Sequence, residues 1–191
     1  MSRLAEIVAA GVPLVATQVQ YSLLDCRPEQ RMVAFCDQRG IALLCYGALA
    51  GGFLSETWRG VRGPPEVPAN RSLTKYSLII DDFGGWDLYQ ELLETLSTIA
   101  RKLDVEVATV ALRWVLDRPT VAAPIVGISR RDRAAQNLAV FSLTLDNDDR
   151  RDINALLSRR TGPHGDVFGL ERQPGGRHAA IMRNNLSHQS S

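Results

Sequence analysis

The sequence predicts an α/β fold with a parallel sheet, and two observations carry this prediction. Three short segments rich in apolar and β-branched residues, 14–21, 41–46 and 121–126, have the length and composition of strands. Segments with helical periodicity alternate with them, which is typical of βα units. The segment 41–46 is apolar throughout, as strands covered on both faces of a parallel sheet usually are.

Helices are predicted where apolar stripes coincide with end signals. Leu4, Ile7 and Val8 share one helix face before Gly11 ends the first helix. Ser129–Asp132 resembles a capping box that opens a helix through Ala139. The predicted helices begin near Ser2, Pro28, Asp87, Val107, Ser129 and Asp146.

Residues 47–86 show little periodicity and contain ten glycines and prolines. We therefore predict one long loop here, and a loop of this length is usually a functional lid or a disordered segment. Residues 159–191 form a second polar segment, rich in glycine and arginine. This composition favours a mobile tail over a loop draped on the body. The expected division is thus 1–158 and 159–191.

The charge balance argues against two classes of partner. Lysine and arginine total 22 and aspartate and glutamate total 21, so the net charge is +1. We expect neither nucleic acid nor an anionic membrane as a partner, because both are bound through a strong positive charge. No apolar stretch is long enough to span a bilayer, and the first residues lack a signal-peptide core. The expectation is a soluble, cytoplasmic protein.

Cysteines and histidines offer little sign of redox or metal chemistry. Three cysteines cannot all pair, and they lie in apolar segments without a Cys-x-x-Cys spacing, which favours core positions over a redox role. The histidines lie in the polar C-terminal segment without metal-ligand spacing, so no metal site is expected. These residues are Cys26, Cys36 and Cys45, and His164, His178 and His188.

Three segments of the sequence form a recognisable combination by their order and spacing. They are Gln18–Asp25, Gly40–Gly52, and Ile125–Arg130 with Arg133, Gln136 and Asn137. Together they resemble the C-terminal half of the aldo-keto reductase family. The resemblance covers residues 3–158, and Gly165–Arg172 continues it in one subgroup. It implies a partial (β/α)8 TIM barrel in which the three predicted strands are the sixth, seventh and eighth.

The resemblance implies NADP(H) as the cofactor, bound in an extended pose at the carboxyl ends of the strands. For Gln18 it implies a hydrogen bond to the nicotinamide carboxamide, and the alternative is a barrel-interior amide paired with a neighbour. For Tyr46 it implies stacking on the nicotinamide ring, and the alternative is a tyrosine that caps the core at the rim. The loop that follows, with Gly47, Leu49 and Gly51, would approach the pyrophosphate closely.

The adenine end of the cofactor falls to residues after the last predicted strand, Gly127 and Ser129 among them. Arg133 and Asn137 are four residues apart and so share a helix face. The guanidinium of Arg133 suits a 2′-phosphate, and the alternative is a solvated surface arginine. Gln136 stands where the family often has glutamate, and it keeps an acceptor for the adenine amino group.

No catalytic residue is predicted in this chain, because the resemblance implies that the family's catalytic Asp, Tyr, Lys and His precede residue 1. Lys75, Tyr76 and the C-terminal histidines do not match the motifs of those residues. The expected function is the cofactor-binding portion of an NADP-dependent reductase of carbonyl compounds. A small-molecule carbonyl substrate is expected only with the N-terminal half present, and unpaired barrel edges would favour self-association. The alternative is a non-enzymatic, nucleotide-sensing or regulatory partner with the same fold.

Overall fold

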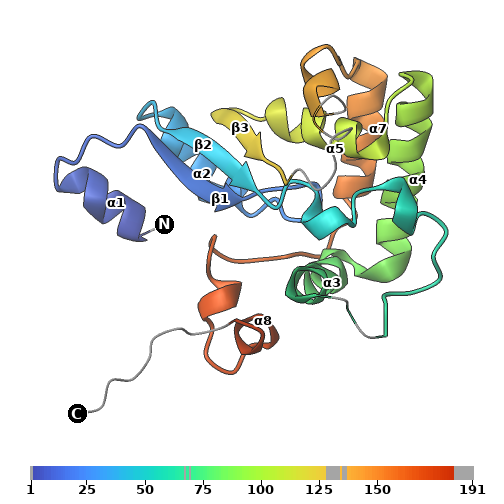
Figure 1. Cartoon of the computed structure of the whole chain (residues 1–191). Helices are drawn as coiled ribbons and strands as arrows, with labels where there is room; N and C mark the ends of the chain where they lie inside the picture. The colour runs from blue at the N-terminus through green and yellow to red at the C-terminus, as the bar shows by residue number, and fades with distance from the viewer. Residues whose placement is uncertain (1, 67, 69, 128–133, 135–136, 183–191) are drawn as a thin grey trace.

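The structure, a computed structural model, describes residues 2–66, 68, 70–127, 134 and 137–182. Three short parallel strands form its sheet (Figure 1). They are β1 (Ala16–Gln20), β2 (Ala42–Tyr46) and β3 (Val121–Ile125), in the order β1-β2-β3. The predicted set of neighbouring parallel strands is thereby confirmed.

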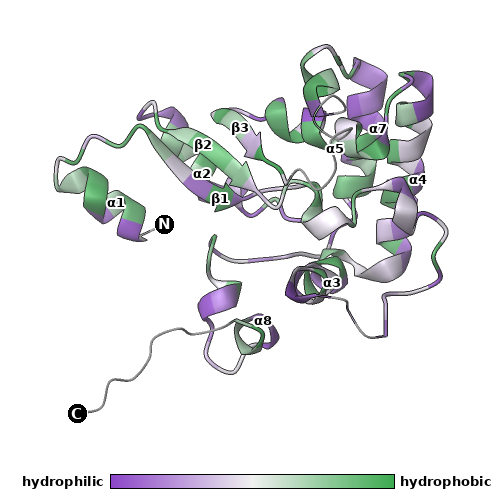
Figure 2. Cartoon of the chain, in the orientation of Figure 1, coloured by the Kyte–Doolittle hydropathy of each residue, from purple (hydrophilic) through white to green (hydrophobic). Residues whose placement is uncertain are grey.

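The two faces of the sheet differ in how they are covered. Side chains alternate between faces along a strand, and Leu43 and Cys45 of β2 point into the core with no exposed surface. On the opposite face Gln18 is exposed, Tyr46 is half-buried and Ile125 is 45% exposed. Figure 2 shows that β2 is the strongly hydrophobic centre of the sheet. The chain therefore buries one sheet face and leaves part of the other open.

Helices α2 and α5 contact the sheet, and α4 and α7 continue the same hydrophobic core beyond it. α4, α5 and α7 pack together on one side of the molecule (Figure 1). The buried stripes of α4 and α5 account for most of this packing, with Trp114 only 1% exposed. The helices are α1 (Ser2–Ala9), α2 (Pro28–Asp37), α3 (Arg71–Phe83), α4 (Gly85–Lys102), α5 (Val107–Leu116), α7 (Asn147–Leu157) and α8 (Arg177–Ala180).

The prediction of one long loop over residues 47–86 was wrong. This segment contains α3, whose N-terminus is capped by Asn70: its side chain accepts a hydrogen bond of 3.0 Å from the Leu73 N–H. Tyr76, Ile79, Ile80 and Phe83 make one buried stripe at helical spacing. The helical spacing of these four residues can be read in the sequence. The prediction missed it because the many glycines and prolines on either side indicated a loop.

The remainder of the segment is held to α4 by aromatic side chains. Phe53 and Trp58 lie 4.6 Å apart between ring centroids, and Trp86 donates a hydrogen bond of 2.7 Å to the Val61 carbonyl. The Tyr89 hydroxyl donates to the Phe53 carbonyl, also at 2.7 Å. These contacts make residues 53–61 an ordered connection with defined partners.

The C-terminal segment, expected to be mobile, packs on the body as far as residue 182. We call residues 159–182 the strap. The Thr161 N–H donates to the Phe83 carbonyl at 2.9 Å, and Arg177 pairs with Asp81 at 3.1 Å. His178 is 5% exposed, with its Nε2 2.7 Å from the Asp82 carboxylate. Of the two alternatives drawn from the sequence, the draped loop is therefore the one observed here.

The cysteines occupy core positions, as the sequence favoured. Cys26, Cys36 and Cys45 are all buried and free. Burial raises the pKa of Cys45 to about 12 and raises that of Cys26 still further, so neither is a thiolate at neutral pH. Within the part of the chain that the structure describes, no helix combines the length and the apolar character needed to cross a bilayer.

Candidate functional site

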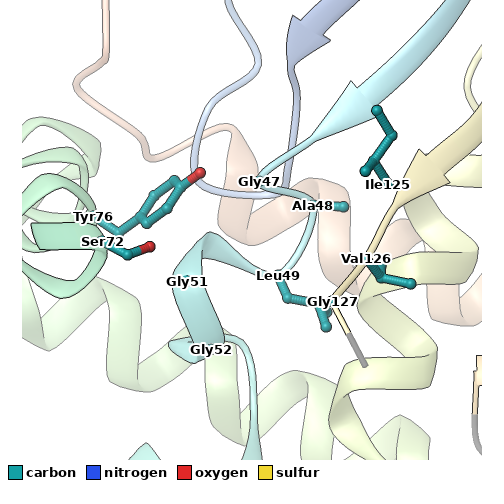
Figure 3. A pocket seen from close by; sticks show the side chains of 10 residues that line it. All are labelled: Gly47, Ala48, Leu49, Gly51, Gly52, Ser72, Tyr76, Ile125, Val126 and Gly127. Atoms are coloured by element: carbon teal, nitrogen blue, oxygen red, sulfur yellow. The ribbon is translucent and has the colours of Figure 1, made fainter. Parts of the chain in front are cut away.

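A cavity of about 590 Å³ lies at the carboxyl ends of β2 and β3 (Figure 3). Four residues predicted to bind the cofactor line it: Gly47, Leu49, Gly51 and Gly127. The loop after β2 forms one wall and the end of β3 forms another. Ligands of barrel folds bind at this end of the strands, so the cavity is in the place where a functional site is expected.

The loop after β2 passes unusually close to α3, and its glycines permit this. Gly47 and Gly51 have positive φ values of 67° and 65°, a conformation that favours glycine. A Cβ at Gly47 would overlap the Tyr76 hydroxyl. A Cβ at Gly51 would lie 2.7 Å from the Tyr76 ring and 2.8 Å from the Ser72 hydroxyl. Both glycines are therefore needed for the shape of the cavity.

α3 supplies two hydroxyl groups to the cavity, from Ser72 and Tyr76 (Figure 3). The Tyr76 side chain is only 6% exposed, and its hydroxyl points towards Gly47. Burial raises the pKa of Tyr76, and the neighbouring Tyr46, Asp25 and Glu171 raise it further. The hydroxyl is therefore a proton-bearing donor at neutral pH.

Beside the cavity, charged side chains meet at the carboxyl end of β1. Arg27 and Asp25 form a buried ion pair of 2.7 Å, and Gln20 donates a hydrogen bond of 2.6 Å to the same carboxylate. Glu171 of the strap lies 3.6 Å from Arg27 and 3.7 Å from Lys75 of α3. We call these five residues the edge cluster. It joins three parts of the chain that are distant in sequence.

Tyr46 stands between the cavity and the edge cluster. It ends β2, opposite Gln20 in the register, and the Lys75 ammonium lies 5.5 Å from its ring centroid. Burial raises the pKa of Tyr46, and the carboxylate of Glu171 adds to this effect. Gln18 lies on the same face of the sheet, opposite Leu44, and is exposed. The two residues assigned to the nicotinamide are thus on one open face.

The predicted adenine end is only partly described. Ser129, Arg133 and Gln136 lie outside the described residues, while Asn137 is described and half-buried. Gly127, at the end of β3, lines the cavity. The structure therefore brings together the predicted pyrophosphate loop and the end of β3, and the roles of the adenine-end residues stay predictions.

Four residues around the candidate site were not predicted from the sequence: Ser72 and Tyr76, which line the cavity, and Lys75 and Glu171 of the edge cluster. The first three lie in the segment that was predicted as a loop, and Glu171 lies in the segment that was predicted as mobile. The Asn70 cap and the buried stripe of α3 were the signals that could have placed the first three. No local signal places Glu171, because its partners are more than ninety residues away in the sequence.

The histidines form no metal centre in the described part of the chain. His164 is exposed beside a second cavity of about 350 Å³ near Cys26, and His178 pairs with Asp82. Among the described residues, no group of three or more histidines, cysteines and carboxylates is placed to hold a metal ion.

The three parallel strands and their helices form part of a (β/α)8 barrel, with a cavity at the carboxyl ends of the strands. The model of the Aldo/keto reductase family matches residues 1–158. The chain belongs to this family, which confirms the resemblance noted in the sequence.

Individual relatives agree with this assignment. Probable aldo-keto reductase 1 of Glycine max is 29% identical over 158 residues, covering 82% of this chain and 42% of the relative. A glycerol dehydrogenase structure from Gluconobacter oxydans has a TM-score of 0.69 at 20% identity, covering 85% of this chain and 48% of that one. An aldo/keto reductase from Klebsiella pneumoniae, in complex with NADP and acetate, has a TM-score of 0.52 at 19% identity, with coverages of 80% and 41%. The chain thus spans less than half the length of these relatives.

Proposed function

We propose that this chain is the cofactor-binding portion of an NADP-dependent aldo/keto reductase that converts carbonyl compounds to alcohols. The observation that carries the proposal is the glycine-lined cavity of about 590 Å³ at the carboxyl ends of β2 and β3. A similar fold in the Klebsiella pneumoniae protein holds NADP, which supports the choice of cofactor.

The residues around the cavity fit a dinucleotide. Gly47 and Gly51 bring the loop backbone close to α3, and the hydroxyls of Ser72 and Tyr76 face the same space. Hydroxyl and backbone N–H groups are suitable donors for a pyrophosphate. In this proposal Tyr46 and Gln18 orient the nicotinamide on the open sheet face, and Arg133 and Asn137 hold the adenine end.

NADPH, when bound, supplies the hydride for the reduction. The role proposed for this chain is to bind and orient the cofactor and to shield one side of it from water. Tyr46 offers a flat ring face, and the protonated Tyr76 hydroxyl offers a hydrogen bond at the glycine loop. The proton that reaches the substrate oxygen is proposed to come from residues outside 1–191, as the resemblance implies.

Two glycine variants test this proposal with matched backbone strain. Gly51 and Gly60 have similar positive φ values, 65° and 75°, but a Cβ at Gly60 would meet no atom within 4 Å. Alanine at either position therefore carries a similar strain of about 1–2 kcal/mol. We expect Gly51→Ala to weaken NADPH binding by about tenfold or more, equal to about 1.4 kcal/mol. Gly60→Ala should leave the affinity unchanged.

The measurement is fluorescence titration with NADPH in the full-length protein, accompanied by steady-state turnover of a carbonyl substrate. Equal affinities for the two variants would show that the cavity is not the cofactor site. Binding that depends on Gly51 without any turnover would favour the nucleotide-sensing alternative over the reductase.

A further inference from the structure

The strap is fastened to α3 by ion pairs at two places (Figure 1). One lies at the carboxyl end of the helix, where Arg177 pairs with Asp81 at 3.1 Å, with side chains 48% and 51% exposed. The other lies in its first half, where Lys75 Nζ is 3.7 Å from Glu171 Oε1. These two side chains are only 19% and 11% exposed. The second fastening is therefore the one shielded from solvent.

The two halves of α3 are packed differently. The buried side chains of the helix all lie between Tyr76 and Phe83. Residues 71–75 contribute none, although Ser72 in this part lines the cavity. The part of α3 that borders the cavity is thus held by little apolar packing, and the pair of Lys75 with Glu171 ties it to the strap.

Glu171 is an ionised carboxylate that two cations share. Its Oε1 lies 3.6 Å from Arg27 as well as 3.7 Å from Lys75. Burial raises the pKa of this carboxyl, but a hydrogen bond from its own backbone N–H and the two cations outweigh burial, so the pKa lies below its ordinary value. Arg27 is itself fixed by its buried pair with Asp25, which follows β1. Glu171 therefore links the first half of α3 to the carboxyl end of β1.

The opposite side of α3 leaves little room for movement. Tyr76 follows Lys75 directly, and a Cβ at Gly47 would overlap the Tyr76 hydroxyl. A Cβ at Gly51 would lie 2.7 Å from the Tyr76 ring and 2.8 Å from the Ser72 hydroxyl. A shift of this part of α3 by the size of a methyl group would thus change the wall of the cavity.

We propose that Glu171 is a positioning residue for the cofactor cavity. It ties the first half of α3 to the end of β1 and so fixes Tyr76 and Ser72 against the glycine loop. Glu171 lies outside the lining of the cavity and acts through Lys75. The inference rests on the proposed function, because it takes this cavity to be the cofactor site.

The first test is fluorescence titration of the full-length protein with NADPH. Glu171→Gln removes both ion pairs with little change in side-chain size. Loss of a negative charge would by itself strengthen the binding of anionic NADPH. Positioning predicts the opposite sign, a loss of affinity of about fivefold or more. The matched control is Arg177→Gln, which removes the strap's pair at the other end of α3 and should leave the affinity unchanged.

Variants of Lys75 test whether Glu171 acts through it. Lys75→Arg keeps a cation that can reach Glu171 and should retain the natural affinity, whereas Lys75→Met should lose it. In the Glu171→Gln background, Lys75→Met should cost much less than in the natural protein, because the shared contact is already absent. Losses that simply add would overturn the proposed route through Lys75. Tighter or unchanged NADPH binding by Glu171→Gln, while Gly51→Ala weakens it, would overturn the inference and leave the proposed function standing.

Hydrogen exchange without cofactor tests the position of α3 directly. By mass spectrometry, Glu171→Gln should speed amide exchange in a peptide covering residues 73–77 more than in one covering 79–83, and Arg177→Gln should not speed it in 73–77. An equal increase along α3 would indicate a general loss of stability and overturn the positioning role. If exchange changes as expected but neither Glu171→Gln nor Gly51→Ala alters NADPH binding, the positioning of α3 is supported and the proposed cofactor site is the part that fails.

Discussion

The guanidinium of Arg27 makes two hydrogen bonds to the Asp25 carboxylate, of 2.9 Å from Nε and 2.7 Å from Nη2, and water is excluded from the pair. The pair lies in the buried loop between β1 and α2. The Arg27 backbone N–H and the Gln20 side-chain amide each donate a further hydrogen bond to the same carboxylate. The pair therefore fixes the carboxyl end of β1, where the edge cluster meets the strap.

Removing Arg27 should destabilise the fold strongly. Arg27→Met leaves the Asp25 carboxylate buried without its cation, and breaking such a pair costs about 3–5 kcal/mol. The matched control is Arg151→Met, because Arg151 and Asp148 form a 2.7 Å pair with side chains 68% and 71% exposed. Its loss should cost about 1 kcal/mol or less. Urea unfolding of both variants makes the comparison, and equal losses would contradict the role given to Arg27.

Acid should weaken the contact between α4 and α7. The hydrogen bond from Lys102 is the largest influence that lowers the pKa of Asp146, to about 2, and the Asp149 N–H adds to it. A carboxyl whose pKa is depressed on folding contributes stability above its unfolded value, 3.8, and loses that contribution as pH falls towards about 2. We expect the thermal midpoint to fall through this window. Asp146→Asn keeps an N-cap acceptor without the charge, so its midpoint should fall less.

If Arg133 binds the 2′-phosphate, Arg133→Ala should weaken NADPH far more than NADH. Only NADPH carries the 2′-phosphate, and one charge-assisted contact contributes about 1.5–3 kcal/mol, roughly ten- to a hundredfold in affinity. Titration of both cofactors against a version of the protein with the barrel's N-terminal half present measures the difference. Equal losses for the two cofactors would identify Arg133 as an ordinary surface residue.

The open sheet should promote self-association of the 191-residue chain. Val15, beside the outer edge of β1, is 80% exposed, and Ile125 of β3 is 45% exposed. Val15→Glu should reduce association in sedimentation velocity, because a charge at a strand edge opposes pairing. Phe141→Glu is the control, since Phe141 is 69% exposed but belongs to the helical part of the fold. A monomeric chain with a sharp thermal transition would contradict this prediction.

Local pattern was sufficient for the strands and for most helices. Each depends on residues close in sequence, such as the apolar segment of β2 or the Asp146 capping box that opens α7. The same signals placed Gly47, Leu49 and Gly51 directly after a strand, and the resemblance implied a cofactor-binding role for that loop. In the structure all three residues line the cavity.

Tertiary structure alone decided what faces that loop. Tyr76 contacts the glycine loop and Lys75 lies beside Tyr46 only because α3 packs there. The sequence of α3 predicts a helix but does not predict which residues it will contact. The strap is equally polar whether it is mobile or bound. Its place follows from Arg177 with Asp81, His178 with Asp82 and Glu171 with Arg27. Each of these pairs joins residues far apart in sequence, so it stabilises the strap only after the chain has folded. Helix caps and apolar stripes, in contrast, depend on residues only a few positions apart.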